Sequence, residues 1–155
     1  MSYERQIDID EFPVLIKEGK RLCRWCQRPI KPPRRTICSD ECIHEIRLRT
    51  DPSYVRQCLK KRDKEICAIC KLDCKALRIR LRLLYQMDKI EWLRLINKFE
   101  IPKNRRHKSL WDANHIVPVC EGGGLTDLDN YETLCIRCHR TETNELLAER
   151  RRKRC

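Results

Sequence analysis

Apolar side chains recur at helical spacing in the middle of the chain. Leu77, Leu81 and Leu84 lie three or four positions apart, so they fall on one face of a helix over about residues 75–86. Basic side chains occupy another face of the same stretch. Within it, residues 78–82 alternate arginine with an aliphatic residue, which is also the pattern of a half-buried strand. We expect the helix and keep the strand as the alternative.

A second apolar series predicts another helix directly afterwards. Asp88 is a suitable N-cap, and Glu91 stands three residues later, where a capping box has its partner. The helix is expected to end before Pro102, because the residue preceding a proline disfavours helical backbone. A basic loop over residues 103–108 follows. The apolar positions of this helix are Trp92, Leu95, Ile96 and Phe99.

Two more helices are predicted nearer the N-terminus. Ser39 is a good N-cap for a helix that extends to about Arg49. Asp51 and Pro52 then suit the N-cap and the first helical position of a second helix, which extends to about Asp63. The residues before this region, 1–20, contain scattered apolar groups and are expected to form a short extended arm.

The last third of the chain reads as strand, loop, strand and helix. A strand is expected to end in Asn114-His115, and a glycine-rich loop then leads to Asn130. A short strand over residues 131–134 and a helix from about Cys138 follow. The glycine triplet Gly122–Gly124 is not a phosphate-binding P-loop, because no Gly-Lys-[Ser/Thr] follows it. We expect it to serve as a flexible crossing between the strands.

Composition points to a small basic protein with a thin core. The chain has 155 residues, a formal charge of +12 and only 6% aromatic residues. Chains with so few large apolar groups often use metals as internal staples. The charge indicates a polyanionic partner, most simply nucleic acid, and a basic protein that binds other proteins is the alternative. No stretch approaches a membrane span, so no membrane partner is expected.

The cysteine pattern indicates metal sites. The segment Met1–Arg5 lacks the basic and apolar regions of a signal peptide, so we expect a reducing intracellular compartment, cytoplasmic or nuclear. Clustered cysteines in such a compartment usually bind metal, and Cys-x2-Cys turns deliver two thiolates to one zinc ion. Eight of the twelve cysteines divide into two sets of zinc ligands, Cys23, Cys26, Cys38 and Cys42, and Cys67, Cys70, Cys135 and Cys138. The others are expected to be free thiols: Cys58, Cys74, Cys120 and Cys155.

Asn114-His115, Asn130 and His139 stand in order within this last third, and His139 directly follows the Cys135-x2-Cys138 pair. This arrangement resembles the HNH nucleases, also called ββα-metal or His-metal finger nucleases. The sequence is similar to small bacterial HNH proteins and to the nuclease segment of some annealing helicases. The resemblance extends over about residues 21–150.

The resemblance implies an α+β fold: a zinc-stabilised protein with a ββα-metal core, a treble-clef-like N-terminal zinc finger and added helices. It implies that His115 is the general base and that Asn130 holds the hairpin and orients the His115 ring. His139 would ligate a catalytic divalent metal, which we expect to be Mg2+, with Mn2+ or Ni2+ as alternatives. The expected substrate is double-stranded or branched DNA, and a helicase or repair protein is a candidate partner.

One position departs from the common family pattern. Many members have aspartate where this chain has Asn114, and an amide oxygen ligates a hard cation without supplying negative charge. Asp112 lies two residues earlier, on the same side of the predicted strand, and is expected to compensate. The alternatives are a catalytically weak or inactive DNA-binding module and an RNA-binding or RNA-cleaving protein. The expected domains are an arm (1–20), a zinc finger (21–50) and an HNH domain (51–155) with a helical insertion at about 75–100.

Overall fold

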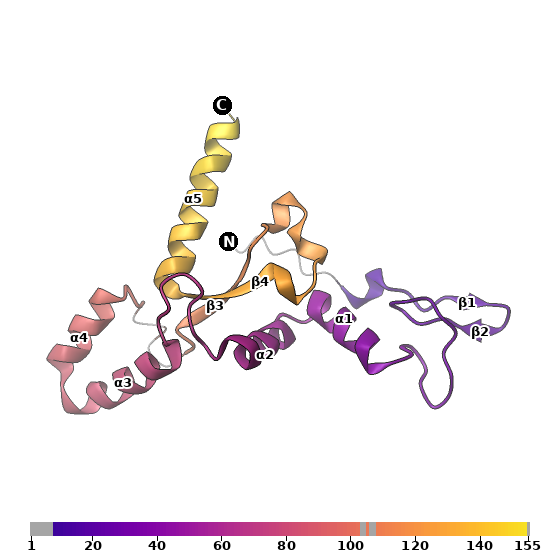
Figure 1. Cartoon of the computed structure of the whole chain (residues 1–155), viewed down its shortest axis with the longest axis horizontal. Coiled ribbons are helices and arrows are strands. Elements are labelled where there is room, and N and C mark those ends of the chain that lie inside the picture. Colours follow the sequence, from indigo (N-terminus) through magenta and orange to yellow (C-terminus); the bar gives the residue numbers. More distant parts are fainter. Residues whose placement is uncertain (1–7, 103–104, 106–107, 155) are drawn as a thin grey trace. The chain divides into compact units, whose positions relative to one another are not determined.

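The computed structural model describes residues 8–102, 105 and 108–154. The described chain forms two compact units. The first unit comprises the residues up to Gln57 together with His115–Asn130, and the second comprises Cys58–Asn114 and the residues from Tyr131 onward. Helices and two small sheets make up the structure (Figure 1), so the α+β class is confirmed. The three-part domain division expected from the sequence stays a prediction.

The first unit begins with short elements. A 3-10 turn, η1 (Ile9–Glu11), precedes the antiparallel strands β1 (Ile16–Lys17) and β2 (Lys20–Arg21). The two residues between the strands, Glu18 and Gly19, both have positive φ, as a tight hairpin turn requires. The expected extended arm is therefore a small hairpin within the described residues.

Helix α1 (Asp40–Thr50) starts where the sequence predicts. The Ser39 side chain caps it by accepting a hydrogen bond from the Cys42 backbone N–H at 3.3 Å. Asp51 then caps α2 (Pro52–Asp63), because its carboxylate accepts from the Tyr54 N–H at 3.0 Å. These caps fix the beginning of both helices.

The helix predicted over residues 75–86 is confirmed, and the strand alternative is wrong. Helix α3 (Cys74–Met87) and helix α4 (Lys89–Lys98) follow one another closely and pack together (Figure 1). Asp88 accepts hydrogen bonds from two backbone N–H groups of α4, as expected of an N-cap. Its capping-box partner behaves differently, because the Glu91 carboxylate pairs with Arg80 at 3.5 Å. The buried faces of the two helices contain Leu77, Leu81, Trp92, Leu95 and Ile96.

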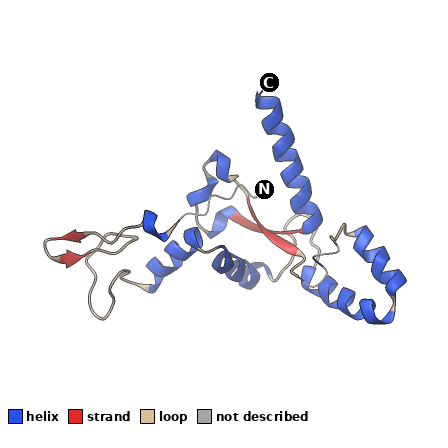
Figure 2. Cartoon of the chain, turned by 180° about the vertical axis from the view of Figure 1, so that it is seen from behind, coloured by secondary structure: helices blue, strands red, loops and turns tan. Residues whose placement is uncertain are grey.

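Strands β3 (Trp111–His115) and β4 (Tyr131–Cys135) form the second sheet, shown as the longer red pair in Figure 2. Backbone hydrogen bonds from Ile116 to Asn130 and from Ile136 to Leu110 flank the pair, which is an antiparallel pattern. Helix α5 (Ile136–Arg154) starts directly after β4, two residues earlier than predicted. The predicted flexible crossing is instead a series of 3-10 turns: η3 (Val119–Glu121), η4 (Gly123–Leu125) and η5 (Leu128–Asn130).

The end of α2 is tied to β4 inside the second unit. The Thr133 hydroxyl, which is fully buried, donates to the Asp63 carboxylate at 2.8 Å. Arg62 donates to the Tyr131 carbonyl oxygen at 2.6 Å. Burial raises the pKa of Asp63, but hydrogen bonds from Arg62 and Thr133 outweigh it and lower that pKa below its ordinary value. Strand β4, which pairs with β3, is thus anchored to a helix.

Two points complete the fold. Most of the predicted basic loop, residues 103–104 and 106–107, lies outside the described residues, although Arg105 is described. Within the described chain, no helix has the length and apolar character that crossing a bilayer requires.

Candidate metal centres and catalytic residues

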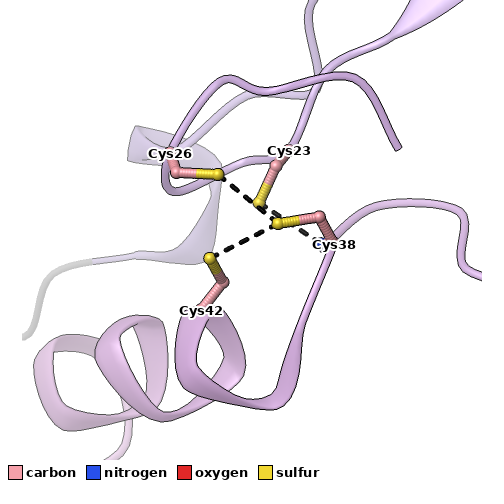
Figure 3. Close-up of side chains that lie close together, drawn as sticks. All are labelled: Cys23, Cys26, Cys38 and Cys42. Carbon is pink, nitrogen blue, oxygen red and sulfur yellow. Dashed lines mark hydrogen bonds between the residues drawn. The ribbon is translucent and has the colours of Figure 1, made fainter. Parts of the chain in front are cut away.

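Four cysteine sulfurs converge in the first unit (Figure 3). The Sγ atoms of Cys23, Cys26, Cys38 and Cys42 all lie within 4.8 Å of one another. Arg28 Nε donates a hydrogen bond to Cys26 Sγ at 3.3 Å and lowers the pKa of that thiol to about 6. A thiolate is the form that binds metal. The four sulfur atoms lie close enough to bind one ion, and Cys26 readily forms the thiolate. This donor set fits a tetrahedral zinc ion.

Local backbone geometry explains why these side chains meet. The chain reverses after Cys26, where Gln27 has a φ of 55° and its N–H donates to the Cys23 carbonyl oxygen at 3.0 Å. The second pair flanks the start of a helix, because Cys38 directly precedes the cap residue and Cys42 lies in the first turn of α1. Helix N-termini stabilise thiolates through their free N–H groups.

The second unit repeats this design. The Sγ atoms of Cys67, Cys70, Cys135 and Cys138 also lie within 4.8 Å of one another, although the two pairs are far apart in sequence. After Cys70 the chain reverses in the same way: Lys71 has a φ of 58° and its N–H donates to the Cys67 carbonyl oxygen at 3.0 Å. The structure therefore brings together both sets that the sequence pattern predicts.

The remaining cysteines belong to neither set. Burial raises the pKa of the Cys74 thiol to about 12, so this side chain stays protonated in the interior. Cys58 and Cys120 lie outside both tetrads, and Cys155 lies outside the described residues. The three described ones form no disulfide and stand outside both tetrads, and their expected state as free thiols stays a prediction.

Polar residues gather on one face of the β3–β4 pair in the second unit. The antiparallel register sets Asn114 opposite Glu132, and Asn114 Nδ2 donates to Glu132 Oε1 at 3.1 Å. Asp112 stands two positions before Asn114 on β3 and therefore faces the same side. Its carboxylate oxygen lies 3.9 Å from Nδ1 of His139, which is in the first turns of α5. Asp112, Asn114, Glu132 and His139 thus line one side of the strands.

Arg105 forms an ion pair with the carboxylate of Asp112. One guanidinium nitrogen of Arg105 donates to both carboxylate oxygens of Asp112, at 2.9 and 2.8 Å. The negative charge that the sequence offered as compensation for Asn114 is therefore already paired. Sequence reasoning missed this ion pair, since Arg105 stood in a basic loop with no predicted partner.

Asn130 is the last residue of the loop that connects β3 to β4, and this loop belongs to the first unit. Its Oδ1 accepts from the Val117 N–H at 2.8 Å, and its Nδ2 donates to the carbonyl oxygens of Val117 and Gly123 at 3.1 and 3.0 Å. Gly123 is required here, because a Cβ atom at this position would overlap the Val117 carbonyl oxygen and approach Asn130 Nδ2 to 2.8 Å. The side chain of Asn130 therefore holds the loop that begins directly after His115.

His115 is the last residue of β3 and is half-buried, with its Nε2 atom shielded from solvent. It belongs with Asn130 to the first unit, whereas Asn114, its neighbour in the chain, belongs to the second. The covalent link between His115 and Asn114 keeps the predicted base one residue from a predicted metal ligand.

The segment that contains β3, the loop, β4 and the start of α5 matches a known protein family. Residues 102–145 match the model of the HNH endonuclease family. The chain is 31% identical over 151 residues to the DNA annealing helicase and endonuclease ZRANB3 of Mus musculus, and 31% identical to the Homo sapiens protein of that name. Each alignment covers 86% of this chain but only 14% of the relative.

A solved structure agrees with the sequence comparison. The crystal structure of the human ZRANB3 HNH domain matches with a TM-score of 0.52 and 29% identity, over 66% of this chain and 94% of that one. The chain therefore carries an HNH-family nuclease domain, and that domain resembles the nuclease segment of an annealing helicase.

Proposed function

We propose that this protein is a metal-dependent DNA endonuclease. The observation that carries the proposal is where the residues expected from the resemblance lie: Asn114-His115 ends β3, Asn130 ends the loop and His139 lies in the first turn of α5. The basic charge of +12 favours a phosphate-rich substrate. Each matched relative is named a DNA annealing helicase and endonuclease, which supports DNA as substrate and a helicase or repair protein as partner.

In this proposal His115 acts as the general base and accepts a proton from the attacking water. Asn130 holds the loop after His115 through three hydrogen bonds to backbone atoms and so limits the orientations of the histidine. The Asn114 amide oxygen and the His139 imidazole would hold a divalent ion, Mg2+ or else Mn2+ or Ni2+. That ion would neutralise charge on the scissile phosphate and the leaving oxygen. The two cysteine tetrads would hold structural zinc.

The test is nicking of supercoiled plasmid by the zinc-loaded protein with Mg2+, with and without His115→Ala. Because a general base contributes about 10²–10⁴-fold, the variant should lose nicking by at least 100-fold. Its DNA affinity should stay close to that of the parent, because the substitution removes the group that accepts the proton and leaves the basic side chains in place. Residual nicking within about tenfold of the parent would exclude His115 as the base.

One observation favours a second candidate, a DNA-binding module without activity. Asn114 is neutral, and Arg105 already pairs with Asp112, so these two residues supply little net charge for a cation. A binder would nick nothing with Mg2+, Mn2+ or Ni2+, yet its affinity for DNA would fall steeply with salt. Cleavage of RNA in preference to DNA under the same conditions would reassign the substrate.

A further inference from the structure

The two side chains expected to bind the catalytic metal, Asn114 and His139, bring no negative charge, so another residue on this face of the β3–β4 sheet must supply it. A hard divalent cation prefers at least one anionic oxygen among or beside its ligands. Asn114 provides a neutral oxygen, and His139 provides a neutral nitrogen. Asp112 is held by both of its oxygens on Arg105, at 2.8 and 2.9 Å, so its charge is offset locally. Another anion must act if a metal is to bind well.

Glu132 lies directly across the strand pair from Asn114. Its Oε1 accepts a hydrogen bond from Asn114 Nδ2 at 3.1 Å, and both side chains are half-buried. Among the residues that the structure describes, no ion pair within 4 Å is recorded for Glu132. The Glu132 carboxylate therefore acts on Asn114, through the hydrogen bond that it accepts from Asn114 Nδ2.

We propose that Glu132 supplies the negative charge that Asn114 lacks and acts as a positioning residue for the metal site. This inference rests on the proposed function. A carboxylate only accepts hydrogen bonds, so it selects the amide orientation in which Nδ2 faces Glu132 and Oδ1 faces away. The amide oxygen is then presented to the cation, and the hydrogen bond to a carboxylate increases the negative charge on that oxygen.

The pair Asn114–Glu132 thus replaces a single ligating aspartate. One residue gives the ligand atom, and its partner gives the charge one hydrogen bond away. Charge near the cation matters here because the pair is half-buried, where screening by water and salt is weaker than at an exposed site. Asp112 has a different part, since its position 3.9 Å from His139 Nδ1 suits it to orient that ring.

The test measures Mn2+ binding to the zinc-loaded protein by the loss of the free-ion electron paramagnetic resonance signal, without DNA. Thiolate sites prefer zinc to manganese, so the tetrads do not interfere. Glu132→Gln keeps the shape of the side chain and removes its charge. We expect it to weaken Mn2+ binding by about 10–100-fold, the usual effect of altering an outer-shell partner of a metal ligand. Glu145→Gln, an exposed change on α5 with the same loss of charge, should leave binding within about twofold, as expected for a screened surface charge.

The charge-swap variant Asn114→Asp/Glu132→Gln separates this role from a merely structural one. It moves the carboxylate from β4 to β3 and should restore Mn2+ affinity to within about threefold of the parent, because the net charge at the site is unchanged. Equal Mn2+ affinity in Glu132→Gln and the parent would overturn the inference while leaving the proposed function intact. Absence of rescue in the double variant would also overturn it. A parent that neither binds Mn2+ nor nicks DNA would overturn both.

Discussion

At the residue scale, the structure assigns a strict steric requirement to one glycine of the triplet. Gly123→Ala would place a methyl group on the Val117 carbonyl oxygen and against Asn130 Nδ2, so the loop must open. We expect a loss of about 1–3 kcal/mol in unfolding free energy, as for other overpacked sites, together with reduced nicking. Urea unfolding of the zinc-loaded protein measures the first effect.

The neighbouring glycine provides a matched control. A Cβ atom at Gly124 would lie 3.0 Å from Cγ1 of Val119, a side-chain atom that is free to shift slightly. Gly124→Ala should therefore cost clearly less than Gly123→Ala. Equal costs for the two variants would contradict the close approach of Gly123 to the Val117 carbonyl.

At the scale of elements, the connection between α2 and β4 is the contact whose removal is most informative. Thr133→Val keeps the volume of a buried side chain and removes the hydroxyl that donates to Asp63. Because the acceptor is a charged carboxylate, we expect a loss of about 1.5–3 kcal/mol at neutral pH. Denaturant unfolding checks this value.

Thr141→Val is the comparison for that measurement, since Thr141 is exposed and its hydroxyl donates to the Arg137 carbonyl oxygen within α5. Its effect should stay within about 0.5 kcal/mol, as for most surface changes. A Thr133 variant as stable as the Thr141 variant would show that the Asp63 contact does not stabilise β4.

Elements were predictable from the sequence to the extent that they depend on local signals. Ser39, Asp51 and Asp88 mark helix starts correctly, because capping depends on residues within one turn. The prediction of a flexible loop before Asn130 is wrong, because the order of this loop comes from a side chain that folds back on Val117 and Gly123.

In the candidate site too, the features set by local sequence were predictable, and those set by long-range contacts were not. Cysteine spacing was sufficient to group both tetrads, since the chain reversals after Cys26 and Cys70 are local and Cys38 and Cys42 flank a helix start. The pairing of Asp112 with Arg105 and the position of Glu132 opposite Asn114 depend on strand register and on a distant loop. No periodicity in the sequence reports such contacts.

At the scale of the whole molecule, we expect two zinc ions per chain and a fold that depends on them, because binding energy at a structural zinc site is folding energy. Cys26→Ser or Cys70→Ser should reduce the zinc content from two ions to one and unfold part of the protein. Elemental analysis and circular dichroism measure both effects. Cys58→Ser and Cys120→Ser are the matched controls and should retain both ions. A zinc-free preparation that unfolds cooperatively with unchanged stability would refute this expectation.

With zinc bound, the second tetrad would also close the polypeptide between its halves into a ring. Cys70 and Cys135 are 65 residues apart in sequence, yet their sulfurs lie 3.7 Å apart, and the α3–α4 hairpin lies within the ring. The entropy of ring closure grows only logarithmically with length, so doubling the ring costs about 0.6 kcal/mol. A segment inserted between Met87 and Asp88, which keeps the Asp88 cap of α4, therefore leaves the closure almost unaffected. This position is the place where a reporter or an extra module is best accommodated without loosening the strands.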